Sequence, residues 1–196
     1  MRVTLLLLVA MTGVYGQSAP TSSAKGSYHL PPDPKRDPWQ LPDQVIAALN
    51  FSNSETVIVI EDGYPYFPQR IAPLVKAVYA VNSDARSFQG PGKLTNVSQT
   101  IEGSDTDPKI KGLNADTIIM VNVLRFLQRG PYFGALSAGL KPGGRLVVID
   151  RNLPSTIPQK ERADDSDVKT ELPLNGFKLV QQFTFLPYQY FLVFQR

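Results

Sequence analysis

The side chains that could do chemistry in this 196-residue sequence are carboxylates, amides, hydroxyls and lysines, because cysteine is absent and histidine occurs once, at His29. Without cysteine the chain has no disulfide, no thiol nucleophile and no thiolate metal site. A single imidazole excludes every metal site that needs two histidines. Catalysis by this chain would therefore depend on its oxygen and nitrogen side chains or on a bound cofactor.

Several acidic residues follow segments that are predicted to be strands. They are Glu61, Asp62, Asp84, Asp105 and Asp107. Open α/β sheets bind ligands at the carboxyl ends of their strands, so these carboxylates would lie near one edge. Oxygen ligands of this kind suit Ca²⁺ or Mg²⁺. Loops collect carboxylates without binding metal as well, and we expect no metal site.

The elements that must position these groups alternate along the chain. Continuous apolar runs rich in β-branched residues predict buried strands, with helices between them. The predicted strands span 56–60, 77–81, 97–101, 115–121 and 145–150, and the predicted helices start at Pro42 or span 68–75 and 133–140. The last helix is expected to end at the Lys-Pro-Gly-Gly sequence of 141–144.

The chain ends in two more β-rich segments, 177–185 and 188–194, which predict an antiparallel pair at the edge of the sheet. Together with the alternating strands and helices before them, they predict a doubly wound α/β domain. Its sheet would be mostly parallel, with an antiparallel C-terminal strand.

The domain organisation is predicted from the start of the chain. Residues 1–16 combine a positive start with an apolar run too short to span a membrane and small residues before Gln17, which is typical of a secretory signal peptide. Residues 17–36 are rich in Ser and Pro and predict a flexible tether. Residues 37–196 form the predicted domain. We expect it to be secreted or periplasmic, with no membrane span once the signal peptide is removed.

The charge of the chain gives no sign of a nucleic-acid partner. Its formal net charge of +3 comes from 20 basic and 17 acidic residues. No dense basic run and no aromatic-basic stripe occurs, so we expect no nucleic acid to bind.

Six stretches of the predicted domain resemble a known family. They are 37–43 (DPWQLPD), 57–67 (VIVIEDGYPYF), 78–82 (VYAVN), 114–116 (NAD), 140–146 (LKPGGRL) and 187–191 (PYQYF). In this order they resemble the class I S-adenosylmethionine-dependent methyltransferases, and within them a group of exported bacterial methyltransferase-like proteins. The resemblance implies a Rossmann-like fold, transferase activity and S-adenosylmethionine as the cofactor.

The cofactor-binding loop departs from the pattern of that family. The family has an acidic residue at the end of the first strand, followed by a Gly-x-Gly-x-Gly turn beneath the methionine part of the cofactor. Here the glycine positions hold Glu61, Gly63 and Pro65, and the acidic position holds Val59. Proline lacks an amide donor, and glutamate fills space that glycine leaves bare. The loop is therefore degenerate, although Glu61 or Asp62 could replace the lost contact to the cofactor's ammonium group.

The resemblance assigns the remaining cofactor positions to polar residues. Asn82 stands where an acidic residue accepts the ribose hydroxyls, although an asparagine there also suits a turn. Ser104 and Asp105 correspond to the residues beside the adenine amino group, and Asn122 to a residue near the transferred methyl group. Arg125 stands where related sequences commonly carry histidine, and it is too basic to act as a general base. No residue is assigned as catalytic.

Two functions stay open on these grounds. Methyl transfer depends mainly on aligning donor and acceptor, so the chain could be an exported methyltransferase for a small-molecule acceptor, with 152–158 and the stretch through Asp167 as a lid or a plain connector. The alternative is a methyltransferase-fold binding or interaction module that has lost the cofactor. The degenerate loop favours the alternative, and so does the export signal, because the cofactor is made in the cytosol.

Overall fold

The fold is taken from a computed structural model that describes residues 35–89, 96–151 and 163–196. The predicted signal peptide, nearly all of the predicted tether and His29 lie outside the described residues. Within the described part of the chain, no helix is long and apolar enough to cross a membrane.

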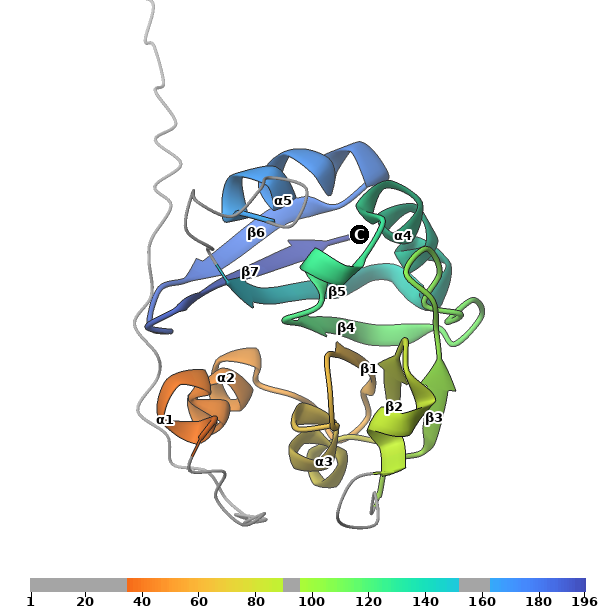
Figure 1. Ribbon diagram of the computed structural model, residues 1–196, viewed down its shortest axis with the longest axis vertical. Helices are drawn as coiled ribbons and strands as arrows, with labels where there is room; N and C mark the ends of the chain where they lie inside the picture. The colour runs from red at the N-terminus through yellow and green to blue at the C-terminus, as the bar shows by residue number, and fades with distance from the viewer. Residues whose placement is uncertain (1–34, 90–95, 152–162) are drawn as a thin grey trace, which may run out of the picture.

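Seven strands form one sheet in the order β3-β2-β1-β4-β5-β7-β6 (Figure 1). They are β1 (Thr56–Glu61), β2 (Ala77–Asn82), β3 (Gln99–Glu102), β4 (Ala115–Val121), β5 (Leu140–Arg151), β6 (Lys178–Phe183) and β7 (Gln189–Gln195). The first five strands pair in parallel, whereas β7 runs antiparallel between β5 and β6. The order reverses between β1 and β4, which is where open sheets bind ligands. The predicted fold class is confirmed.

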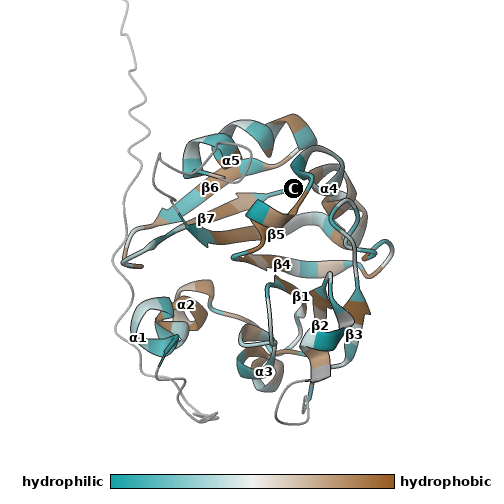
Figure 2. Ribbon diagram, viewed as in Figure 1, coloured by the Kyte–Doolittle hydropathy of each residue, from teal (hydrophilic) through white to brown (hydrophobic). Residues whose placement is uncertain are grey.

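The central strands are buried on both faces, as their sequences predict. From Val57 to Ile60, no residue of β1 is more than 3% exposed. Hydrophobic colour also runs along β5 and β7 (Figure 2). Parallel strands covered by helices on both faces need such continuous apolar runs.

The helices form two layers on either side of the sheet (Figure 1). The α-helices are α1 (Asp37–Gln40), α2 (Pro42–Leu49), α3 (Phe67–Ile71), α4 (Arg129–Leu136) and α5 (Asp165–Glu171). α2 and α3 bury Val45 and Phe67 in one core cluster. α4 and α5 bury Phe133 and Val168 in the other cluster, on the opposite face.

The helix predicted at 68–75 is shorter than expected. α3 ends at Ile71 and is followed by a single 3-10 turn, Ala72–Leu74. Pro73 lies inside this turn and has no N–H to continue an α-helical hydrogen-bond pattern.

The helix predicted at 133–140 was placed one turn too late. α4 spans Arg129–Leu136, and a 3-10 turn carries the chain to Gly139 before β5 begins at Leu140. A Cβ at Gly139 would lie 2.6 Å from Ile110 Cγ1, so this turn packs against the loop before β4. The sequence at 141–144 belongs to β5 and does not end the helix.

α5 begins in the charged stretch for which the sequence predicts either a lid or a plain connector. Asp164 caps it, because its side chain accepts the N–H of Asp167 while the Asp167 side chain accepts the N–H of Asp164. Val168 is fully buried beneath the helix. This part of the stretch is therefore a packed element of the domain, while 152–162 lies outside the described residues.

Candidate functional site

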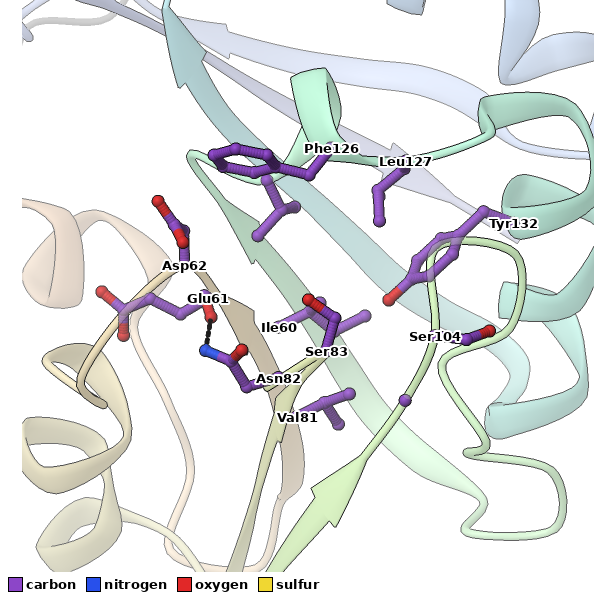
Figure 3. A pocket seen from close by; sticks show the side chains of 12 residues that line it. Ile60, Glu61, Asp62, Val81, Asn82, Ser83, Ser104, Phe126, Leu127 and Tyr132 are labelled. Atoms are coloured by element: carbon purple, nitrogen blue, oxygen red, sulfur yellow. Dashed lines mark hydrogen bonds between the residues drawn. The ribbon is translucent and has the colours of Figure 1, made fainter. Parts of the chain in front are cut away.

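A small cavity lies at the carboxyl edge of the sheet, where β1 and β2 end (Figure 3). Glu61, Asn82 and Ser104, three of the residues predicted to bind the cofactor, line it together with Phe126 and Tyr132. Its volume is about 20 Å³, which is room for about one water molecule. The structure therefore brings half of the predicted residues together around this small space.

Glu61, the last residue of β1, is bonded through both carboxylate oxygens. Its Oε1 pairs with Arg36 Nη2 at 2.5 Å, and its Oε2 accepts the N–H groups of Tyr66 at 2.9 Å and Phe67 at 3.0 Å. The residue is only 3% exposed, and burial raises the pKa of its carboxyl above the ordinary value even though Arg36 and the two N–H groups lower it. The carboxylate points away from Phe126, Leu127 and Tyr132 on the other side of the cavity (Figure 3).

Arg36 belongs to a cluster that fixes α1 on the loop after β1. Its guanidinium carbon lies 4.0 Å from the centroid of the Tyr66 ring, and that of Arg70 lies 3.8 Å away. Asp37 accepts a hydrogen bond from the Tyr66 hydroxyl and pairs with Arg70 at 3.1 Å. Burial, together with the bond to Asp37, raises the pKa of Tyr66. The segment just before the domain is thus held against Glu61.

Asn82, at the end of β2, holds the same loop from the other side. Its Nδ2 donates to the main-chain oxygen of Glu61 at 2.7 Å (Figure 3). It also donates to the main-chain oxygen of Gly63 at 2.9 Å. Its Oδ1 accepts the N–H of Asp84 at 2.9 Å. An ionised acid could not make the first two bonds, because it has no N–H to donate. The amide is therefore required by the contacts of this loop.

Gly63 needs its missing side chain for backbone reasons. It has φ of +74°, a left-handed conformation that glycine adopts without strain. Space does not require the glycine, because no atom lies within 4 Å of where a Cβ would be. Val59, at the position of the family's acid, is fully buried in the core cluster beneath α2 and α3. Strand β1 thus offers no carboxylate at Val59, and the loop after the strand turns tightly at Gly63.

Ser104 and Asp105 have different surroundings. Ser104 lines the cavity, and its hydroxyl accepts the N–H groups of Thr106 at 3.3 Å and Asp107 at 3.0 Å. Asp105 is exposed, and its carboxylate accepts a hydrogen bond from Gln128 Nε2 at 2.8 Å. Asp105 therefore ties its loop to the start of α4, and only Ser104 of this pair lies at the cavity.

The acidic residues considered for a cation have separate partners. Asp84 pairs with Arg86 at 2.8 Å, and Asp107 accepts the N–H of Lys109 at 2.7 Å. In the described ranges, no group of three or more His, Cys, Asp and Glu residues could hold a metal ion. The idea of a cation bound by these carboxylates is not supported.

A second, larger cavity of about 290 Å³ adjoins the first at Asp62, which lines both. Its other lining residues are Arg36 and Trp39 of the N-terminal segment, Asn122 and Arg125 after β4, and Asp150 and Arg151 at the end of β5. The Arg151 guanidinium carbon lies 4.9 Å from the centroid of the Trp39 ring. Asn122, predicted near the transferred methyl group, lines this second cavity and not the first.

Asn122 is fixed by two glutamines that the sequence did not single out. Gln189 Nε2 donates to Asn122 Oδ1 at 2.9 Å, and Gln40 Nε2 donates to Gln189 Oε1 at 3.2 Å. Both glutamines are buried, although they come from α1 and β7 at opposite ends of the domain. The only signal for them in the sequence was their place inside the two stretches DPWQLPD and PYQYF.

Asp150 is a buried carboxylate that holds the loop after β4. It is 8% exposed and accepts the N–H groups of Leu124 at 3.0 Å and Arg151 at 2.8 Å. Burial raises the pKa of its carboxyl, and these main-chain bonds lower it by less. Because its oxygens already have main-chain partners, Asp150 positions the loop that carries Asn122 and Arg125.

The sequence matches no family model and no curated protein. Solved structures are nevertheless similar to it in fold. A SAM-dependent methyltransferase from Aquifex aeolicus is 18% identical, with a TM-score of 0.68 over 83% of this chain and 93% of that one.

Two further solved structures are similar over almost the same length. The N-methyltransferase NodS from Bradyrhizobium japonicum is 13% identical, with a TM-score of 0.62 over 83% of this chain and 96% of that chain. A TehB-like SAM-dependent methyltransferase from Corynebacterium glutamicum is 14% identical, with a TM-score of 0.64 over 79% and 86% of the two chains. The domain therefore has the Rossmann-like fold of SAM-dependent methyltransferases.

Proposed function

We propose that this chain is a small-molecule binding module built on the methyltransferase fold, and that it no longer uses S-adenosylmethionine. One observation carries the proposal. The polar groups of Glu61 and Asn82 are bonded to the protein's own groups, at the two positions where the fold would hold the cofactor. Arg36 supplies the positive charge that the cofactor's ammonium group would bring to Glu61.

The residues at this edge do not fit the cofactor. Asn82 has no carboxylate for the two ribose hydroxyls and uses both amide hydrogens on main-chain oxygens. Pro65 removes one main-chain donor from the loop, and Val59 is buried in the core. The adjoining cavity has room for about one water molecule. We therefore derive no methyl transfer through this site.

Calorimetry with S-adenosylmethionine and S-adenosylhomocysteine tests this proposal. We expect no binding of either compound up to millimolar concentration. Micromolar binding that is abolished by Gly63→Val would overturn it, because valine is strained at the left-handed φ of this position. Asn53→Val, on the exposed loop before β1, is the matched control for the substitution itself.

A second candidate function is an S-adenosylmethionine-dependent methyltransferase acting on a small-molecule acceptor. It is favoured by the placement of Glu61, Asn82 and Ser104 around one cavity at the switch point of the sheet. For this function, Arg36 would have to leave Glu61 before the cofactor could bind. The calorimetric experiment separates the two functions, since only a methyltransferase requires tight binding of the methyl donor.

We also propose that the protein acts outside the cytosol, in the periplasm or the medium. The support is the signal-peptide pattern of residues 1–16. Mass spectrometry of the protein expressed with its own N-terminus tests this proposal. We expect a mature chain that begins near Gln17, and an intact Met1 in a cytosolic fraction would contradict it.

A further inference from the structure

A series of hydrogen bonds between side chains fixes which atom of Asn122 is left as a donor at the second cavity. This hydrogen-bond series begins at Arg36, whose guanidinium has only N–H donors. Arg36 Nε donates to Gln40 Oε1 at 3.0 Å, so Gln40 must turn its amide nitrogen toward Gln189. Gln40 Nε2 then donates to Gln189 Oε1 at 3.2 Å. The orientation of each amide is thus fixed by the one before it.

The hydrogen-bond series ends at Asn122, which offers a donor at the cavity. Gln189 Nε2 donates to Asn122 Oδ1 at 2.9 Å, which uses the Asn122 carbonyl. Its Nδ2 therefore carries the free N–H groups, and none of the described residues accepts a hydrogen bond from them. Asn122 lines the cavity, so this nitrogen is left to donate to whatever the cavity holds.

The guanidinium groups of Arg125 and Arg151 line the cavity together with the carboxylates of Asp62 and Asp150. Arg125 lies 3.9 Å from Asp62, too far for a hydrogen bond, and its side chain is 50% exposed. Arg151 lies over the Trp39 ring, and no carboxylate in the described part of the chain pairs with it. Asp150 also lines the cavity, but main-chain N–H groups occupy its oxygens.

We infer that this cavity binds a small organic anion through a carboxylate or phosphate group. The anion accepts hydrogen bonds from Asn122 Nδ2 and from the guanidinium groups of Arg125 and Arg151, with the indole of Trp39 against its flat apolar part. Guanidinium groups bind such oxyanions in a two-pronged geometry. A volume of about 290 Å³ suits a single ring with its acidic substituent. This inference rests on the proposed function and names its class of ligand.

The fluorescence of Trp39 provides the measurement, because it is the single tryptophan of the chain and lines the cavity. The full chain is titrated with benzoate and with phenyl phosphate, which separate the two oxyanions. Benzamide, the neutral relative of benzoate, is the control ligand. We expect at least one of the two anions to bind and benzamide to bind at least tenfold more weakly.

Matched variants tie the binding to the cavity. Asn122→Asp keeps the oxygen that Gln189 binds but replaces the free amide nitrogen by a carboxylate oxygen. We expect it to weaken anion binding at least tenfold, and Arg151→Gln to do the same. Asn53→Asp and Arg86→Gln make the same charge changes at exposed positions away from this cavity, and we expect them to change binding less than twofold.

Three results would overturn the inference. They are no binding of either anion, equal binding of benzamide, or an equal effect of the cavity variants and their controls. None of these depends on S-adenosylmethionine. A failure of the proposed function is detected separately, as micromolar binding of S-adenosylmethionine or S-adenosylhomocysteine in the calorimeter.

Discussion

At the scale of single residues, an amide stands where the fold family uses an acid, and the difference decides what the side chain can do. Asn82 donates twice and accepts once, and all three bonds stay within the loops after β1 and β2. A carboxylate at this position would accept hydrogen bonds from a ribose but would face two main-chain oxygens in this structure. Asn82 therefore stabilises the folded conformation of the loop after β1.

Replacing Asn82 by aspartate should destabilise the protein instead of restoring a cofactor site. We expect Asn82→Asp to lower the free energy of unfolding by about 3 kcal/mol, because two buried acceptors lose their donors and meet a negative charge. Asn82→Ala, which removes the bonds without adding charge, should cost about 2 kcal/mol. Urea denaturation measures both. An aspartate variant as stable as the native chain would contradict this role for Asn82.

Removing Arg36 should also be costly, because it leaves the buried carboxylate of Glu61 without its cation. We expect Arg36→Met to lower the free energy of unfolding by about 3 kcal/mol. Arg86→Met is the control, because Arg86 is 85% exposed and, among the residues that the structure describes, pairs only with Asp84. Equal denaturation midpoints for Arg36→Met and Arg86→Met would show that the Arg36 pair contributes nothing to stability.

That this site departs from the family pattern is a prediction from the sequence, and the sequence gives no sign of the partners that these residues have in the structure. Glu61, Pro65 and Asn82 differ from the family pattern at positions that can be counted along the chain. Arg36 lies 25 residues before Glu61 and falls in the segment predicted to be a tether, so nothing in the spacing relates the two. Contacts of this kind depend on how α1 packs, which the linear pattern does not contain.

At the scale of elements, the acidic side chain of Asp116 links strands at the opposite edge of the sheet. Asp116 of β4 accepts the N–H of Thr56, at the start of β1, at 2.8 Å, and pairs with Lys141 of β5 at 2.6 Å. Burial raises the pKa of its carboxyl, but these hydrogen bonds and the charge of Lys141 lower it further, so that it lies below the ordinary value. Asp116 thus links three neighbouring strands in their register.

Its contribution to stability should disappear in acid. A carboxyl whose pKa is lowered in the folded state stabilises the protein above its unfolded pKa, and loses that effect as the pH falls through the folded pKa. We expect Asp116→Asn to cost about 1 kcal/mol at neutral pH and progressively less below about pH 3.8. Denaturation at several pH values measures the difference. A cost that stays constant or grows on acidification would contradict it.

The strands were predicted well because continuous β-branched runs have few alternatives in a sheet covered on both faces. The ends of the helices were predicted less well. α4 begins a turn before its apolar residues suggest, and its end is set by the approach of Gly139 to Ile110, a contact far apart in sequence. α5 was missed because its capping pair and its one fully buried residue, Val168, lie in a charged stretch.

At the scale of the whole molecule, the strand order of the methyltransferase fold is kept while its carboxyl edge is rebuilt. The N-terminal segment reaches across that edge and pairs Arg36 with Glu61, and α1 also reaches β7 through Gln40 and Gln189. The first cavity at this edge has room for about one water molecule, and the second, larger cavity lies beside it at Asp62. We propose that the fold binds small molecules at this edge through the second cavity.

The most direct test is the free energy of unfolding of the full chain, measured in urea with and without S-adenosylhomocysteine. A ligand that binds only the folded state at one hundred times its dissociation constant would raise this free energy by about 2.7 kcal/mol. We predict no change at millimolar ligand, because Glu61 and Asn82 are already bonded within the protein. A stabilisation of that size, lost in the Gly63→Val variant, would contradict the account.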